Sequence, residues 1–161
     1  MDHEDNVIIH STLEDGEDFF ITDRYKKKYH FKISVFDVPS GVVAEAMQVV
    51  SGNGQEPYLF HMLFDFDVDQ EYAELKLKQK IKKGIDKRYL QVRNKELSIN
   101  KSETLVGRLE WNDNMNDTEF DSMLVVDGKR ITIEKLVKLL EPYGGFNIKI
   151  TIHDLCDEIP E

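Results

Sequence analysis

Apolar and polar side chains alternate along much of the first half of the chain. Residues 29–35 place Tyr, Phe, Ile and Val on one face and His, Lys and Ser on the other, which is the period of a half-buried strand. Val38-Pro39-Ser40-Gly41 predicts a tight turn, and a second strand follows over residues 42–50. The Asn-Gly pair in residues 51–54 predicts a further turn, and residues 58–66 alternate aromatic or methionine side chains. The pattern predicts an antiparallel meander of three strands, with the aromatic face of the third strand in the core.

A helical period follows the third strand. Asp69 is a good N-cap for a long helix over residues 70–88. Its predicted buried stripe has apolar residues four apart: Ala73, Leu77, Ile81 and Ile85. On the neighbouring face four lysines recur at spacings of four, three and four: Lys76, Lys80, Lys83 and Lys87.

The second half predicts several short strands and one short helix. Residues 89–99 hold one or two short strands, residues 104–111 another, and residues 123–126 a strand that turns at Asp127-Gly128. Thr132 is a helix cap, and Gly144-Gly145 lies beyond the end of that helix. The predicted apolar face of the helix is Ile133, Leu136, Val137 and Leu140. A final strand is predicted where apolar residues alternate again: Phe146, Ile148, Ile150 and Ile152.

Together these elements predict an α+β fold. We expect a single antiparallel sheet of five to seven strands, with one long helix after the third strand and one short helix before the last. A chain of 161 residues is most simply one domain. Residues 1–23 are expected to form either a hairpin around Asp15-Gly16 or a mobile acidic arm, and residues 154–161 a frayed acidic tail.

Charge is sorted into blocks along the sequence. Residues 1–23 hold eight acids and no Lys or Arg, and residues 37–75 again hold eight acids and no base. Residues 76–101 hold ten bases against two acids, while the whole chain has a net charge of −10. Such segregation favours attraction between segments or partners and argues against one uniform acidic coat.

Composition limits the class of protein. With 40% hydrophobic and 32% charged residues the chain is typical of a soluble globular protein. The acidic first residues do not resemble a secretory signal, no apolar run spans a bilayer, and the single cysteine is Cys156, so the cytoplasm is the expected location. Because nonspecific affinity for nucleic acid comes from basic groups, the net charge makes that class of ligand unlikely.

Two stretches carry a resemblance to a known group of proteins. These are residues 29–41, Tyr-His-Phe-Lys-Ile-Ser-Val-Phe-Asp-Val-Pro-Ser-Gly, and the run from Val126-Asp127-Gly128-Lys129 through Glu141-Pro142-Tyr143-Gly144-Gly145-Phe146. From about residue 24 onward the chain resembles a family of uncharacterised proteins, a domain of unknown function, from Gram-positive bacteria. The shared motifs are turn and core residues, so the resemblance implies a cytosolic bacterial domain and no site residue.

Candidate metal ligands are few. Asp65, Asp67 and Asp69 alternate after the third strand and would gather a hard divalent cation if their carboxylates pointed to one side. The alternative is that Asp69 caps the helix while the other two are solvated near its positive end. His30, His61 and His153 lie opposite the apolar faces of their strands, and His153 with Cys156 makes a zinc half-site at most.

No catalytic motif or cofactor-binding motif is present, so we expect no catalytic residue and no cofactor. The preferred hypothesis is a non-catalytic protein-interaction module that uses charge-segregated surfaces, with an unknown protein or a second copy of the chain as partner. Its candidate binding residues are the four lysines of the helix face. The alternative interpretation is that these lysines form a solvated surface whose charge balances the chain's own acidic blocks. Two other hypotheses stay open: a metal-dependent enzyme or binder at the Asp65, Asp67 and Asp69 cluster, and a phosphate or nucleic-acid ligand on the lysine face.

Overall fold

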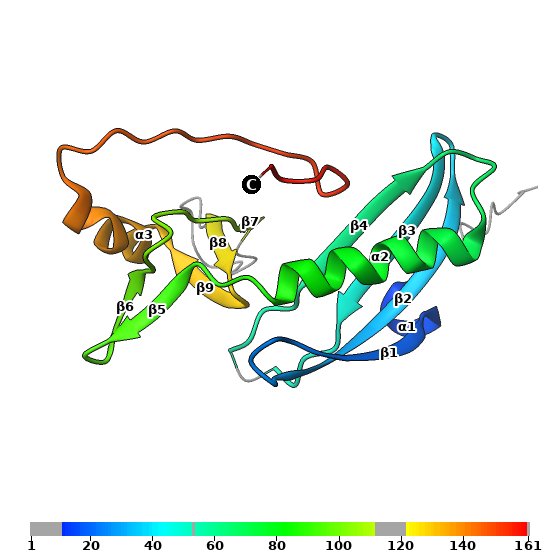
Figure 1. Ribbon diagram of the computed structural model, residues 1–161, viewed down its shortest axis with the longest axis horizontal. Helices are drawn as coiled ribbons and strands as arrows, with labels where there is room; N and C mark the ends of the chain where they lie inside the picture. Colours follow the sequence, from blue (N-terminus) through cyan, green and yellow to red (C-terminus); the bar gives the residue numbers. More distant parts are fainter. Residues whose placement is uncertain (1–10, 53, 112–121, 161) are drawn as a thin grey trace, which may run out of the picture.

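Figure 1 shows the computed structural model of the protein, which describes residues 11–52, 54–111 and 122–160. The described residues form these elements in chain order: α1 (Thr12–Asp15), β1 (Glu17–Thr22), β2 (Lys28–Val38), β3 (Gly41–Gln48), β4 (Leu59–Phe64), α2 (Gln70–Ile85), β5 (Leu90–Arg93), β6 (Glu96–Ile99), β7 (Arg108–Trp111), β8 (Ser122–Val126), β9 (Lys129–Thr132), α3 (Ile133–Leu140) and the 3-10 helix η1 (Glu141–Tyr143). No helix among these residues is long and apolar enough to cross a membrane. The α+β class predicted from the sequence is confirmed.

The predicted meander is present and gains one strand. β1, β2, β3 and β4 form an antiparallel sheet in chain order, with Ile33 opposite Ala46 and Ala46 opposite Phe60. The turn from β2 to β3 passes close to the end of β4. A Cβ atom on Gly41, whose φ is 151°, would lie 2.1 Å from the carbonyl oxygen of Phe64, so only glycine fits at this position.

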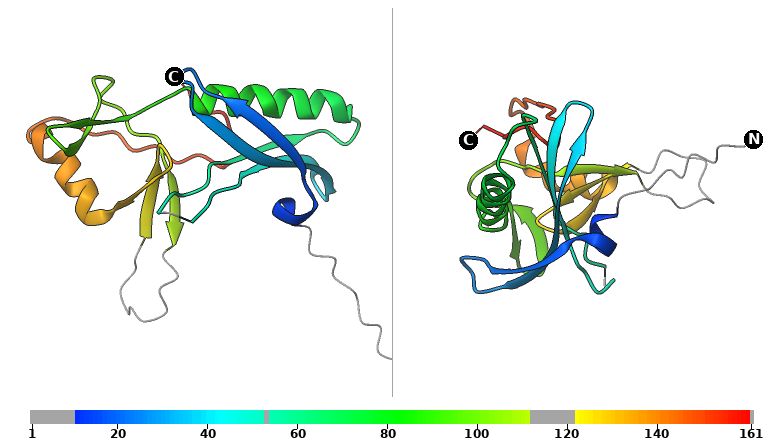
Figure 2. Two further views of the ribbon diagram at one scale, coloured as in Figure 1. Left: turned by 90° about the horizontal axis from the view of Figure 1, so that it is seen from below. Right: turned by 90° about the vertical axis from the view of Figure 1, so that its right-hand side faces the viewer.

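Helix α2 covers one face of this sheet, and the short helix α1 lies on the other (Figure 2). The four residues of the predicted helical stripe are all buried: Ala73, Leu77, Ile81 and Ile85. They pack against the inward side chains of the sheet, including Phe31, Ile33, Ala44 and Ala46. The four-residue spacing on the helix and the two-residue spacing on the strands therefore build the first hydrophobic core.

A second core lies beyond α2. β5 and β6 form a two-stranded sheet, while β7, β8 and β9 form a three-stranded sheet on which α3 packs. The core residues of this part are Leu90, Ile99, Val126, Ile131 and Leu139. The Thr132 side chain accepts a hydrogen bond from Lys135 N at 3.2 Å, which confirms the predicted helix cap.

The prediction of a single sheet is wrong. The described strands form three separate sheets, because the chain leaves the first sheet along α2 and its later strands pair with each other around the second core. The predicted final strand is also wrong: residues 146–152 pair with no strand among the described residues. An alternating sequence indicates only which side chains share a face. A strand also needs a neighbouring strand with free backbone groups to which it can hydrogen-bond.

Three smaller predictions need correction. Asp69 stands at the N-cap of α2, but its side chain makes no capping hydrogen bond. Phe66 lies beyond the end of β4 and is 66% exposed, although Phe60, Met62 and Phe64 do pack against the first core. On α3, Leu136, Leu139 and Leu140 face the second core, while Ile133 and Val137 are exposed.

Residues 1–10 and 112–121 lie outside the described residues. The predicted hairpin around Asp15-Gly16 is wrong for the described part of residues 1–23, because residues 12–15 form α1 and β1 pairs with β2. The mobile-arm alternative is not tested for residues 1–10.

Candidate functional site: the lysine face of helix α2 and the acidic tail

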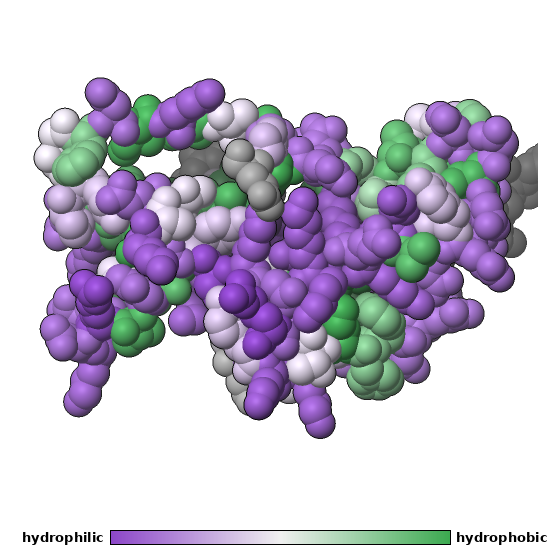
Figure 3. All heavy atoms as spheres, viewed as in Figure 1, coloured by the Kyte–Doolittle hydropathy of each residue, from purple (hydrophilic) through white to green (hydrophobic). Residues whose placement is uncertain are grey.

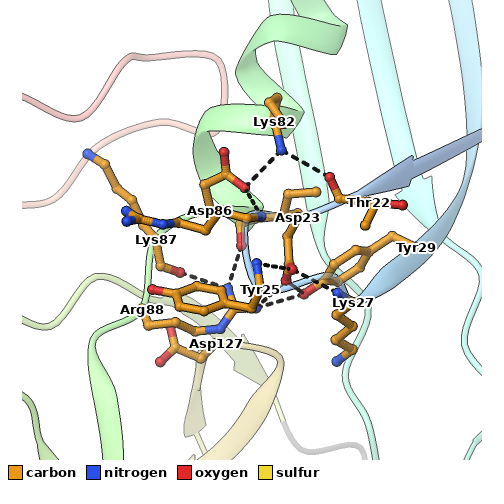
Figure 4. Close-up of polar contacts among 12 residues, drawn as sticks. Thr22, Asp23, Tyr25, Lys27, Tyr29, Lys82, Asp86, Lys87, Arg88 and Asp127 are labelled. Atoms are coloured by element: carbon orange, nitrogen blue, oxygen red, sulfur yellow. Dashed lines mark hydrogen bonds and ion pairs between the residues drawn. The ribbon is translucent and has the colours of Figure 1, made fainter.

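A buried carboxylate joins the β1–β2 turn to the end of α2 (Figure 4). The Asp23 side chain is fully buried, and its Oδ1 accepts hydrogen bonds from Tyr25 N at 2.8 Å and Lys27 N at 2.9 Å. Its Oδ2 accepts from Tyr29 Oη at 3.0 Å and from Arg88 Nη2 at 2.6 Å. Both oxygens of Asp23 are thus occupied by donors of the fold, which favours a structural role over a catalytic one.

Ionisation at this cluster follows from those contacts. Burial opposes the charge on Asp23, but hydrogen bonds from Lys27 N, Tyr29 Oη, Tyr25 N and Arg88 outweigh it and lower the pKa of its carboxyl. Burial, followed by the hydrogen bond to Asp23, raises the pKa of Tyr29 to about 12. At neutral pH the cluster therefore holds an ionised Asp23, a neutral Tyr29 and a charged Arg88.

Residues at the C-terminal end of α2 make further hydrogen bonds to both halves of the chain. From the first half, Arg24 N donates to Asp86 Oδ1 at 2.7 Å. From the second half, the Asp127 carboxylate in the β8–β9 turn accepts from Tyr89 N at 2.9 Å and Leu90 N at 2.8 Å. We name Asp23, Asp86, Arg88 and Asp127 the junction, because they connect the two hydrophobic cores.

The junction bears on the expectation of a single domain, which stays a prediction. We expect one cooperative unfolding transition, because the segment from Asp86 to Leu90 is bonded to both halves. Urea unfolding followed by Trp111 fluorescence, which reports the second half, should coincide with unfolding followed by far-ultraviolet circular dichroism. Two separated midpoints would contradict the expectation and define two independent units.

The predicted lysine face lies on α2, and its members have different environments. Lys80 Nζ donates to the backbone oxygen of His61 at 2.7 Å and to that of Leu155 at 3.0 Å. Lys76 Nζ lies 5.5 Å from the centre of the Tyr72 ring, and Lys83 and Lys87 also make contacts of their own. The four lysines are therefore not four equivalent solvated charges, and Lys80 contacts both the sheet and the C-terminal tail.

The tail that Lys80 holds is acidic and turned. Asp154 Oδ1 accepts from Cys156 N at 2.8 Å, and Asp157 N donates to Asp154 O at 3.0 Å. Burial lowers the pKa of Lys80, whereas neighbouring acids of the tail, including Glu158, Asp157 and Asp154, act in the opposite direction. An acidic segment of the chain itself thus lies against Lys80, a half-buried lysine of this face.

The other candidate residues do not come together. Asp65, Asp67 and Asp69 are all exposed in the loop between β4 and α2. Within residues 11–52, 54–111 and 122–160, no three His, Cys, Asp or Glu side chains lie close enough to hold a metal ion.

The histidines have separate partners. His30 Nε2 is 2.6 Å from Asp18 Oδ1, and His61 Nε2 is 3.2 Å from Glu45 Oε2. These two residues lie on the sheet face opposite α2, as predicted, whereas His153 lies outside any strand.

Sequence reasoning missed the junction and the contact between Lys80 and the tail. Asp23 and Arg88 are 65 residues apart, and Lys80 and Leu155 are 75 apart. A partial signal existed for the junction, because Asp23 begins a turn and aspartate commonly accepts from backbone two residues on, as it does here from Tyr25 N. Nothing local marks Arg88 or Lys80 as different from their neighbours.

Two family models match the chain. Residues 14–86 match a model described as a domain of unknown function, DUF7686, and residues 86–157 match one described as a domain of unknown function, DUF7713. The two matches meet at Asp86, the C-cap of α2 and a member of the junction. No curated protein and no solved structure matches the chain. The expected resemblance to domains of unknown function is confirmed, while neither description names a Gram-positive source.

Proposed function

We propose that this protein is a non-catalytic protein-interaction module, in which the lysine face of α2 binds an acidic segment of polypeptide. The observation that carries the proposal is the contact between Lys80 and the chain's own acidic tail. The tail is an intramolecular example of such a ligand, and a partner segment of similar chemistry would compete for the same place.

The geometry favours polypeptide recognition of a particular kind. Lys80 donates to the backbone oxygen of Leu155 and not to a carboxylate, so the hydrogen bond itself does not depend on the ligand's side chain. Acidic residues around that bond then contribute long-range attraction, which salt weakens because the screening length is about 8 Å at physiological ionic strength. Lys76, Lys83 and Lys87 extend the positive charge along the helix.

A phosphate or nucleic-acid ligand fits this surface less well. Asp154, Asp157 and Glu158 are near enough to raise the pKa of Lys80 against the effect of burial, and they would repel phosphate groups as long as the tail stays in place. The aspartate cluster before α2 does not converge in the described residues, so no observation supports a metal-dependent activity there.

Cys156, the chain's single cysteine, gives a direct readout of the tail. Burial and then the Asp154 charge raise the pKa of its thiol, so the docked tail should react slowly with a disulfide reagent at pH 8. Adding a synthetic peptide of residues 152–160, with serine in place of Cys156, should displace the tail and speed the reaction several-fold at low salt. The acceleration should disappear at high salt.

Variants at two lysines make the test specific. Lys80→Met should release the tail, so that Cys156 reacts fast without peptide and no faster with it. Loss of the Lys80 charge alone would raise the thiol pKa slightly. Burial raises that pKa more, so exposure of Cys156 on release of the tail should lower it overall. Lys101→Met, at an exposed turn residue, should behave as the wild type. The proposal fails if Lys80→Met reacts like the wild type and the peptide has no effect at low salt.

A further inference from the structure

The segment that leads to the tail exposes an apolar face. Alternate residues of the segment are largely exposed: Phe146 65%, Ile148 63%, Ile150 84% and Ile152 91%. Figure 3 shows apolar and polar residues alternating along the upper edge of the molecule, where this segment runs. Isolated exposed apolar residues are common on proteins, but a continuous row of them marks an interaction site.

Both ends of the segment are fixed, and its middle is not. At one end Phe146 N donates to Tyr143 O at 2.9 Å, and the two rings meet edge to face at 5.8 Å. At the other end Lys80 holds Leu155. Between them, residues 147–153 make no hydrogen bond with any other residue that the structure describes. The segment is therefore held at both ends but assigned to no strand, and the backbone groups of its middle are available for pairing.

The charge of the segment favours a second copy of this chain as its partner. From Pro142 to His153 there is no Asp or Glu, and Lys149 is the one Lys or Arg. The whole chain has a net charge of −10, so two copies would repel each other over much of their surface. This segment is a long stretch free of acids that two copies can bring together.

Two copies of this segment can pair in a register that keeps their like charges apart. Directly opposite residues of antiparallel strands share a face, so a two-fold axis must pass beside one residue of each strand. With the axis at Lys149 two ammonium groups would oppose each other. With the axis at Ile150, Ile148 opposes Ile152 and Lys149 opposes Thr151, and Phe146 keeps its contact with Tyr143.

We propose that residues 148–152 of two copies pair antiparallel about a two-fold axis at Ile150, which makes the protein a homodimer. A two-stranded ribbon alone is only marginally stable in water, so its apolar face needs a cover. Exposed apolar residues of the same half of the chain can supply it, among them Leu109 on β7 and Ile133 and Val137 on α3. This pairing does not require the lysine face to bind a partner.

Disulfide trapping tests the register. In a Cys156→Ser background, Ile150→Cys should oxidise to a covalent dimer, because the two side chains oppose each other across the axis. Lys149→Cys in the same background should give at least fivefold less dimer, since its own copy is not opposite. Equal trapping of the two variants would overturn the proposed register.

Sedimentation tests the dimer itself. The wild type should dimerise at micromolar concentration, and Ile150→Lys should weaken dimerisation at least tenfold. Because Ile150 is exposed, the thermal melt of a wholly monomeric sample should be unchanged by this substitution, which separates lost pairing from misfolding. A wild type that stays monomeric throughout, or amides of residues 147–153 protected from exchange in the monomer, would overturn the proposal in favour of another protein or of the chain's own sheet edge.

Discussion

Replacement of Asp23 by alanine is expected to lower the free energy of unfolding by about 3–5 kcal/mol, the range found when one partner of a buried ion pair is removed. The side chain of Asp23 is fully buried, whereas that of Arg88 is 23% exposed. Loss of the Asp23 carboxylate would leave the Tyr29 hydroxyl, the Arg88 guanidinium and two backbone amides without their acceptor. Urea unfolding at neutral pH measures the change.

Asp18 supplies the matched control. It also accepts from two cationic or ionisable side chains, Lys32 at 2.7 Å and His30 at 2.6 Å, but its side chain is 52% exposed. Solvent screens exposed pairs of this kind, so Asp18→Ala should change stability far less than Asp23→Ala. If the two alanine variants lose the same amount, the junction has no special place in the stability of the fold.

Asp23 also makes the stability of the protein depend on pH in a definite direction. The pKa of Asp23 is lowered in the folded protein, so its contribution is complete above about pH 4, the usual value of an unfolded aspartate. It is then lost as the pH falls through the lower folded pKa. Asp23→Asn, which cannot ionise, should flatten this acid limb of the stability curve. An acid limb identical to that of the wild type would assign it to other carboxylates.

Truncation of Leu77 to alanine is expected to cost about 2–5 kcal/mol, because it leaves a cavity in the first core. Leu77 has no exposed surface and lies among Ile81, Phe31 and Ala44. Leu75, two residues away on the same helix, is 53% exposed, so Leu75→Ala should change stability by less than about 0.5 kcal/mol. Both variants lose the same atoms from the same helix, and chemical unfolding of the pair therefore isolates burial. Similar losses would mean that α2 does not pack as described.

The parts of the fold that sequence analysis predicted correctly depend on local spacing. The four-residue spacing of Ala73 through Ile85 and the two-residue spacing of residues 29–35 each determine which face is apolar. An apolar helix face and an apolar strand face that follow each other in the chain have few ways to be buried except against each other. That reasoning was sufficient for β2, β3, β4 and α2, but not for β1.

Residues 146–152 show where the same reasoning ends. Their alternation is as regular as that of residues 29–35, but no strand of the described chain lies beside them. The lysine face shows a second limit, since spacing places Lys80 on the correct line without indicating that a tail 75 residues later would rest on it. Contacts between distant segments depend on the direction in which the chain leaves each element, and no local pattern records that direction.

The bonds around the end of α2 impose a constraint on chain length. Asp23 holds Arg88, and Asp127 holds the amides of Tyr89 and Leu90, so consecutive residues are bound to opposite halves of the chain. One residue spans about 3.5 Å at most, and an inserted residue here would shift one set of donors out of reach of its acceptor. The position at which the two family models meet is therefore a poor place to lengthen the chain, and tags or inserted domains belong in loops far from it.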